Sequence, residues 1–146
     1  MAVLVSRYNE LVTVRLLDGA RECLRDKGVP EARVDVIWVP GAFELPVAAE
    51  TAAASGRYAA LVALGCVIRG ETPHFDYVAG EAARGLGNVA LAHQLPIGFS
   101  VLTTETLEQA IARAGGASGN KGYEAAAAAL TTADVLAQLT RAAPRD

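Results

Sequence analysis

The apolar positions of this 146-residue chain follow two periodicities that alternate along the sequence. Short, nearly continuous apolar runs are typical of strands buried on both faces, and they occupy 2–5, 34–39, 58–65 and 97–102. Apolar residues at helical spacing follow the runs and predict helices over 12–27, 42–55, 73–90, 107–114 and 123–140. This alternation predicts an α/β fold: a three-layer sandwich with a central four-stranded parallel sheet.

Polar and small residues mark the ends of these predicted elements. Thr104 or Thr106 is expected to cap the fourth helix, since a threonine hydroxyl can accept a bond from a free N–H group of the first turn. Residues 119–122 are expected to form a loop and residues 143–146 a frayed tail. Because no internal repeat or linker interrupts the pattern, residues 1–146 are predicted to form one domain.

The polar stretch 65–77 lies where the third predicted strand gives way to the third helix. Right-handed crossovers bring all strand-to-helix connections to the carboxyl edge of a parallel sheet, where ligands bind in open α/β folds. Thr72 is expected as the N-cap and Pro73 as the first helical residue, so that unpaired N–H groups form a site for an anion such as phosphate. His74 follows, and histidine changes charge near neutral pH. An ordinary strand–turn–helix with a solvated histidine has the same pattern, so both interpretations stay open.

Other residues near this edge also have two interpretations. Tyr8 follows the first strand either as a packed surface residue or as a flat face on which an aromatic ligand stacks. Glu44 either complements a helix dipole or binds a ligand. Arg113 suits the C-terminal end of a helix in any case, Lys121 is expected to be solvated, and Phe99 is expected in the core.

Composition narrows the possible partners. Hydrophobic residues make up 52% of the chain but aromatic residues only 5%, and this alanine-rich surplus of apolar surface predicts burial between subunits. The net charge of −3 and the lack of a basic stripe argue against nucleic acid. Cys23 and Cys66 lack metal-binding or redox spacing and predict reduced thiols in a cytoplasmic protein. We find neither a signal peptide nor an apolar run long enough for a membrane span.

Several common motifs are missing from the sequence. It contains no GxGxxG after the first strand, no GxxxxGK[ST] and no GxSxG, which argues against a dinucleotide-binding protein, a P-loop NTPase and an α/β-hydrolase. The two histidines, His74 and His93, lie about five turns apart on one predicted helix and cannot share a metal ion. The sequence therefore predicts no metal site.

Five motifs in order resemble the 6,7-dimethyl-8-ribityllumazine synthase family over nearly the whole chain: SRYN with LLDGA downstream, VPGAFELP, ALGCVIRGETPHFDY, LTTETLEQA and GNKGYE. The resemblance implies a flavodoxin-like fold and a step of riboflavin biosynthesis. In that step 5-amino-6-ribitylamino-2,4(1H,3H)-pyrimidinedione condenses with 3,4-dihydroxy-2-butanone 4-phosphate and phosphate is released, without any cofactor. It also implies a homopentamer, or a multiple of pentamers, with active sites between adjacent subunits.

Site residues follow from the resemblance position by position. One subunit is implied to hold the pyrimidine ring and its ribityl chain through three groups of residues: Tyr8; Ala42, Phe43 and Glu44; and Cys66, Val67 and Ile68. Glu71 and Thr72 match the phosphate-binding turn, and His74 matches the proton-transfer residue. The residues implied to approach from the adjacent subunit, or to lie near that interface, are Phe99, Arg113 (on the phosphate), Lys121 and Glu124.

Two points stay open at this stage. Relatives commonly carry an N-terminal arm that adds to a neighbour's sheet, whereas the first strand is predicted here from Ala2, so assembly beyond a pentamer is undecided, as is direct transfer of the product to a riboflavin synthase. A non-catalytic flavin- or pteridine-binding module and a structural shell subunit are alternative functions. The combination of Thr72, His74 and Arg113 favours the enzyme over both.

Overall fold

Four parallel strands form the central layer of the protein, whose computed structural model describes residues 1–141. The strands are β1 (Ala2–Ser6), β2 (Asp35–Val39), β3 (Leu61–Ile68) and β4 (Ile97–Thr104), and they lie in the order β2-β1-β3-β4. This confirms the predicted parallel sheet. The tail expected at 143–146 lies outside the described residues.

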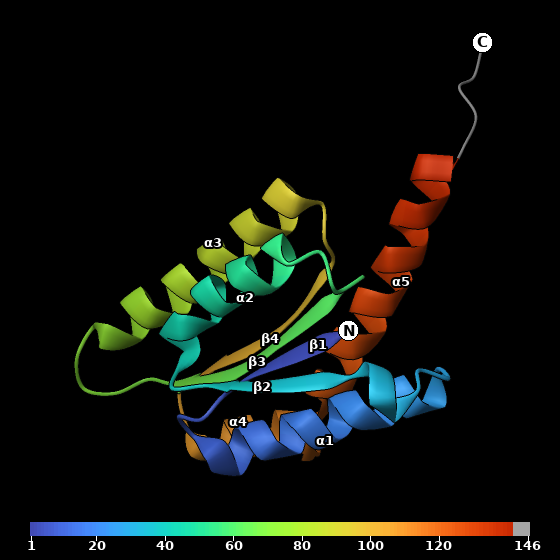
Figure 1. Cartoon of the computed structure of the whole chain (residues 1–146). Helices are drawn as coiled ribbons and strands as arrows, with labels where there is room; N and C mark the ends of the chain where they lie inside the picture. Colours follow the sequence, from blue (N-terminus) through green and yellow to red (C-terminus); the bar gives the residue numbers. More distant parts are fainter. Residues whose placement is uncertain (142–146) are drawn as a thin grey trace.

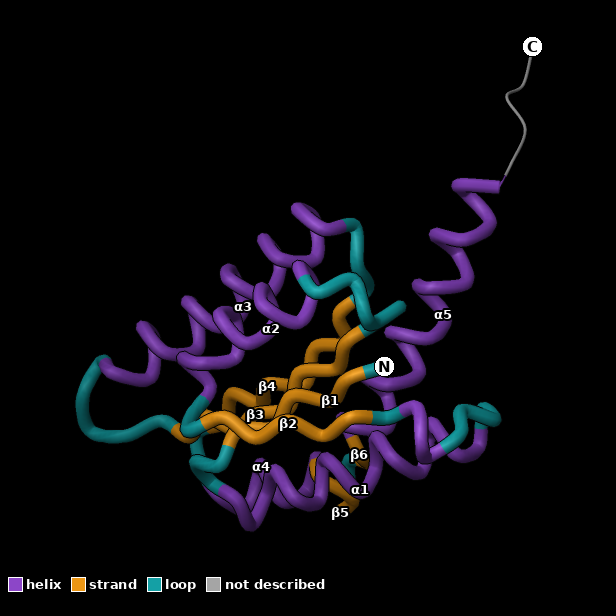
Figure 2. The backbone as a smooth tube through the Cα atoms, in the orientation of Figure 1, coloured by secondary structure: helices purple, strands orange, loops and turns teal. Residues whose placement is uncertain are grey.

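Helices cover both faces of the sheet (Figure 1). Helices α2 (Leu45–Ala54) and α3 (His74–His93) cover one face. The other face carries α1 (Glu10–Asp26), α4 (Leu107–Arg113) and α5 (Lys121–Arg141), and the C-terminal half of α5 extends beyond the sheet. The three-layer sandwich is therefore confirmed, and Figure 2 shows the sheet enclosed between the helices. Short 3₁₀ turns, η1 (Glu31–Arg33) and η2 (Ala42–Glu44), flank β2, and a small hairpin of β5 (Ala114–Gly116) and β6 (Gly119–Asn120) precedes α5.

Alternation along the strands divides the core into two clusters. Val3, Val5 and Leu64 face α1 and α5, whereas Leu4 and Ala63 face α2 and α3. All five residues of β1 are buried, as a central parallel strand requires. Within residues 1–141, no helix combines the length and apolar character needed to cross a bilayer.

Several predicted boundaries were wrong because strand pairing or a side-chain cap sets them. β3 begins at Leu61 rather than at residue 58, and it continues through Ile68 because β4 pairs with it as far as Thr104. The polar stretch expected as a loop thus begins as strand. α5 begins at Lys121 rather than at residue 123, since the Asn120 side chain accepts hydrogen bonds from the N–H groups of Gly122 (2.8 Å) and Tyr123 (3.1 Å).

The two threonine caps had different outcomes. Thr106 caps α4 as predicted, with its hydroxyl accepting from the Gln109 N–H at 3.2 Å. The prediction for Thr72 was wrong: α3 begins at His74, Pro73 holds the cap position, and no side chain caps this helix. The first turn of α3 therefore keeps its N–H groups free of a side-chain cap.

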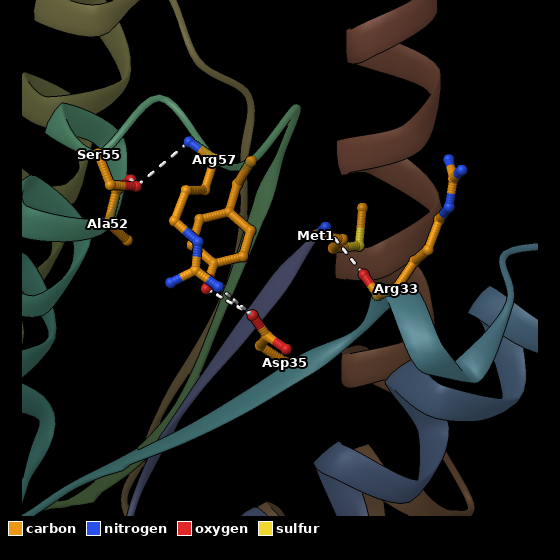
Figure 3. Close-up of polar contacts among 7 residues, drawn as sticks. Met1, Arg33, Asp35, Ala52, Ser55 and Arg57 are labelled. Atoms are coloured by element: carbon orange, nitrogen blue, oxygen red, sulfur yellow. Dashed lines mark hydrogen bonds and ion pairs between the residues drawn. The ribbon is translucent and has the colours of Figure 1, made fainter.

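The amino edge of the sheet is closed by polar contacts (Figure 3). The Met1 ammonium donates to the Arg33 carbonyl at 3.1 Å, and the Arg57 guanidinium lies 3.5 Å from the Asp35 carboxylate. Tyr58 donates to the same carboxylate at 2.6 Å, which fixes the chain just before β3.

The carboxyl edge, in contrast, opens between β1 and β3. The chain leaves β1 for α1 on one face and leaves β2 for α2 on the other, so the strand order reverses at this point, where doubly wound sheets form a crevice. β1 ends at Ser6, while β3 continues to Ile68 beside β4. The last residues of β3 therefore have no strand beside them on the β1 side, and their backbone forms one wall of that crevice.

Candidate active site

A cavity of about 730 Å³ occupies the crevice between β1 and β3. Its lining comes from the ends of three strands and from the start of α3: Tyr8, Pro40, Gly41, Ala42, Phe43, Glu44, Cys66, Val67, Ile68, Gly70, Thr72, His74, Phe75, Tyr77 and Val78. The structure therefore brings together eight of the residues predicted from sequence, together with His74. Glu71 lies exposed on the same connection and does not line the cavity.

Backbone bonds hold Tyr8 at the mouth of this cavity. The N–H of Arg7 donates to the Val39 carbonyl at 2.8 Å and that of Tyr8 to the Pro40 carbonyl at 3.0 Å, so pairing with the β2 segment continues past the end of β1. The Tyr8 side chain is 73% exposed and offers a flat aromatic face to a ligand.

Asn9 connects Tyr8 to the opposite wall, and sequence reasoning missed it. Its backbone is left-handed, with φ 61°, a conformation that asparagine tolerates better than most residues. The side-chain amide does not cap α1 but donates to the Cys66 carbonyl at 2.8 Å. Only the fold brings these residues together, so no local sequence signal could have identified the contact.

The backbone of β3 offers a donor and an acceptor to the cavity. The N–H groups of Leu61 and Arg69 donate toward β4, to the carbonyls of Pro96 and Thr104, each at 2.9 Å. Because successive residues of a strand point their N–H and C=O groups to opposite sides, those of Cys66 and Ile68 point toward β1 and the crevice. Ile68 lies beyond the end of β1, so β1 does not use its N–H and C=O groups. These two groups can bind a ring that has a hydrogen-bond acceptor next to a donor on its edge.

Glu44 supplies the one carboxylate that the described part of the chain places in the lining of the cavity. It ends the turn η2 and is half-buried, and a Cβ placed on Gly41 would lie 3.3 Å from its Oε1 atom. Glycine at position 41 therefore leaves room for this carboxylate, which accepts hydrogen bonds from hydroxyl groups when ionised.

Cys66 is buried at the base of the cavity. Burial raises the pKa of its thiol to about 11, so the thiol stays protonated at neutral pH. Because the thiolate is the nucleophilic form of cysteine, Cys66 is part of the wall and not an attacking group.

The start of α3 gives the cavity its polar end. Gly70, Thr72 and His74 line it, all three residues are exposed, and the positive end of a 20-residue helix lies beside them. Backbone N–H groups at a helix N-terminus suit an anion such as phosphate. Thr72, whose side chain does not cap the helix, lines the cavity together with His74.

A second depression, of about 430 Å³, follows β4, the edge strand of the sheet. It contains all four residues that the sequence assigned to an adjacent subunit or its interface: Phe99, Arg113, Lys121 and Glu124. Among residues 1–141, none lines both this groove and the cavity. The structure thus places the predicted site residues of one chain on two separate surfaces.

Contacts within the β4 groove differ from expectation at two positions. Phe99 was expected in the core, but it is 49% exposed on β4, an edge strand of the sheet. Lys121 was expected to be solvated in a loop, whereas it is half-buried at the start of α5, with its Nζ 3.1 Å from the Glu124 carboxylate. Arg113 ends α4, where one guanidinium nitrogen donates to the Gln109 carbonyl at 2.9 Å.

Sequence reasoning also missed several residues that line the cavity. Phe75 and Val78 belong to the apolar residues that predict the helix over 73–90, and they also line the cavity because the first turns of α3 extend past the end of β3. Tyr77 is 74% exposed and lies on the turn that follows His74. Their position in the first two turns of a helix that follows a strand was the signal available in the sequence.

Comparison with known families identifies the protein family in which this site occurs. Residues 1–137 match the family of 6,7-dimethyl-8-ribityllumazine synthase. The chain belongs to this family. The synthase is a transferase of riboflavin biosynthesis that condenses 5-amino-6-ribitylamino-2,4(1H,3H)-pyrimidinedione with 3,4-dihydroxy-2-butanone 4-phosphate to 6,7-dimethyl-8-ribityllumazine and releases phosphate. Family membership also implies oligomeric assembly, and it agrees with the flavodoxin-like order of the sheet.

Proposed function

We propose that each active site of this synthase forms between two subunits, with the cavity of one chain completed by the β4 groove of its neighbour. The observation that carries the proposal is the division of the predicted site residues between two surfaces that share no lining residue. A heterologous contact, in which different surfaces of identical chains meet, closes into a ring when its rotation permits. We propose a pentamer as that ring.

In this proposal the cavity binds the pyrimidinedione. The exposed ring of Tyr8 stacks on the heterocycle, and the Ile68 backbone pairs with its imide edge, which offers an N–H group between two carbonyls. The Glu44 carboxylate accepts hydrogen bonds from the ribityl hydroxyls. Ala42, Phe43, Cys66 and Val67 provide the remaining walls.

The butanone phosphate binds at the polar end, with its phosphate at the N-terminus of α3. Backbone N–H groups and the Thr72 hydroxyl bind the phosphate oxygens, and Arg113 of the neighbour adds charge-assisted hydrogen bonds that also stabilise phosphate as it leaves. The carboxylate of Glu71 would repel phosphate, so only its backbone N–H group suits this role. Phe99 of the neighbour closes the apolar side.

His74 transfers the protons of the reaction. The amine of the pyrimidinedione attacks the ketone and forms a Schiff base with loss of water, elimination then expels phosphate, and tautomerisation and ring closure with loss of a second water give the lumazine. Each step moves a proton between carbon, nitrogen or oxygen, which a histidine at neutral pH can accept and return. Holding the two substrates in contact can itself supply about 7–11 kcal/mol, so positioning is a large part of the catalysis.

Mixed oligomers test the shared site. We would co-express His74→Ala and Arg113→Ala chains, purify the mixed oligomers and measure lumazine formation by fluorescence at limiting butanone phosphate. If each site takes His74 from one chain and Arg113 from its neighbour, about a quarter of the sites in an equal mixture are intact, and activity exceeds that of either variant alone.

The same experiment has a clear contrary outcome. If both residues belong to one chain's site, every site in the mixture lacks one of them and no activity is regained. A native mass corresponding to five chains, or a multiple of five, is expected for all samples. We further propose a cytoplasmic location, which the two buried free thiols, Cys23 and Cys66, support.

A further inference from the structure

The connection from β3 to α3 swings away from the sheet before the helix begins, as Figures 1 and 2 show. His74 is the first residue of that helix, it is exposed, and no side chain caps the helix in front of it. Some other contact must hold the first turn of α3 in place if His74 is to meet the substrates in a fixed geometry.

Arg69, the first residue after β3, makes such contacts. Its guanidinium Cζ lies 4.4 Å from the centre of the Phe75 ring, and one terminal nitrogen lies 3.5 Å from the Asp76 carboxylate. Phe75 and Asp76 directly follow His74. The guanidinium Nε donates to Glu105, between β4 and α4, at 3.1 Å.

The backbone of Arg69 is fixed to the sheet. Its N–H group donates to the Thr104 carbonyl at 2.9 Å and so continues the pairing of β3 with β4. From this anchored backbone, the rigid planar guanidinium group can contact one carboxylate and one aromatic face of α3 at the same time. A lysine ammonium, as a single point of charge, cannot reproduce both orientations.

Arg69 itself does not line the cavity, whereas Phe75, under its guanidinium, does. We infer that Arg69 is a positioning residue, which holds the first turn of α3 against the end of the sheet and thereby sets where His74 meets the substrates. The inference rests on the proposed role of His74. Both ion pairs of Arg69, with Asp76 and with Glu105, are exposed to solvent, and exposed ion pairs contribute little to stability. Loss of Arg69 is therefore expected to displace His74 rather than to impair folding.

Arg69→Met tests the inference, because it keeps an aliphatic side chain and removes the guanidinium group. We expect kcat to fall on the order of 10- to 100-fold, the range that a displaced catalytic group produces. The KM for the pyrimidinedione should not change, since Tyr8 and Glu44 are held by other contacts. Arg69→Lys, which keeps the charge, should recover part of the lost kcat and provides a second variant should the first assemble poorly.

Arg57→Met is the matched control. Arg57 precedes β3 at the amino edge of the sheet, pairs with Asp35 at 3.5 Å (Figure 3), and lies 5.3 Å from the centre of the Tyr58 ring. It thus has the same kinds of partner as Arg69 at the opposite end of the same strand. Its loss should leave kcat unchanged, with a melting temperature close to that of Arg69→Met.

A double-mutant cycle with His74→Ala separates the possible results. If Arg69 acts through His74, Arg69→Met lowers kcat in the native chain and has little further effect when His74 is already absent. An equal loss in both backgrounds, or no loss in the native chain, overturns the inference. If His74→Ala alone leaves kcat unchanged, the proposed role of His74 is wrong, and so is the positioning role of Arg69. The His74→Ala variant by itself therefore distinguishes failure of the proposed function from failure of the inference about Arg69.

Discussion

His74 shows how much of this site depends on where a residue lies along the chain. Sequence reasoning could place it at the cavity, together with Tyr8 and Glu44, because each lies on a connection, or in the first turn of a helix, that follows a predicted strand, and the ends of parallel strands meet at one edge. Asn9 could not be found in this way. Its role depends on a contact with Cys66, 57 residues away in the sequence, which exists only after the strands have assembled.

Replacement of His74 by alanine should slow the synthase without abolishing its activity. We expect kcat to fall by about 10²-fold, because proton transfer is lost while substrate positioning is kept. Steady-state lumazine fluorescence is the measurement, and His93→Ala, at the other end of α3, is the control that should retain full kcat. Complete loss of activity in a folded His74→Ala oligomer of native mass would contradict the prediction.

Arg113 should act on one substrate only. Because a charge-assisted hydrogen bond contributes about 1.5–3 kcal/mol, Arg113→Ala is expected to raise the KM for the butanone phosphate by about 10- to 100-fold. The KM for the pyrimidinedione should stay as it is. Arg25→Ala, on α1, serves as the control for a lost positive charge, and an unchanged KM for the phosphate substrate would remove Arg113 from the site.

At the level of whole elements, the sequence predicted which segments are strands and helices better than where they end. Apolar runs identify buried strands because every residue of β1 and the first six residues of β3 are buried. The ends have two different causes: pairing with β4 extends β3 to Ile68, and the Asn120 side chain caps α5, which begins at Lys121. The strand pairing leaves no local signal in the sequence, whereas an asparagine before a helix is a local signal that the periodicity of apolar residues does not include.

The packing of α5 on α1 depends on a glycine. A Cβ on Gly122 would strike the Leu16 carbonyl oxygen and lie 2.7 Å from its carbon, so the two helices approach more closely than side chains would allow. Gly122→Ala should therefore lower the free energy of unfolding by about 1–3 kcal/mol, the usual cost of overpacking. The midpoint of denaturant unfolding at fixed protein concentration measures this change.

Gly80→Ala provides the comparison for that measurement. Gly80 lies within α3, where an added Cβ meets nothing within 4 Å, so alanine should be neutral or slightly stabilising there. Equal midpoints for the Gly122 and Gly80 variants would show that the α1–α5 contact tolerates an added methyl group.

For the molecule as a whole, the free energy of unfolding is expected to fall at alkaline pH. Burial raises the pKa of Cys66 from 9.0 to about 11 and also raises the pKa of Cys23, while hydrogen bonds to Asp35 and Asp26 raise the pKa values of Tyr58 and Tyr123. The folded state thus binds more protons than the unfolded state above about pH 9, and the stability present below that pH is lost as pH rises through about 11.

Unfolding midpoints measured from pH 8 to 11 at constant protein concentration test this expectation. The midpoint should fall as the pH rises, and Cys66→Ala should fall less steeply than the native chain because one of the linked groups is absent. A native midpoint that does not change up to pH 11 would contradict the prediction. Measuring the oligomer mass at each pH separates loss of folding from dissociation of subunits.

The donor and acceptor that Ile68 turns toward the cavity belong to the main chain, and this has a consequence for how the gene can vary. A substitution of Ile68 changes the side chain but keeps both backbone groups, unless the new residue is proline, which lacks the N–H. No single base change converts an isoleucine codon into a proline codon. The ring recognition proposed for this position would therefore survive most point mutations, because substitution of Ile68 is limited by side-chain volume and strand pairing rather than by the chemistry of the ligand.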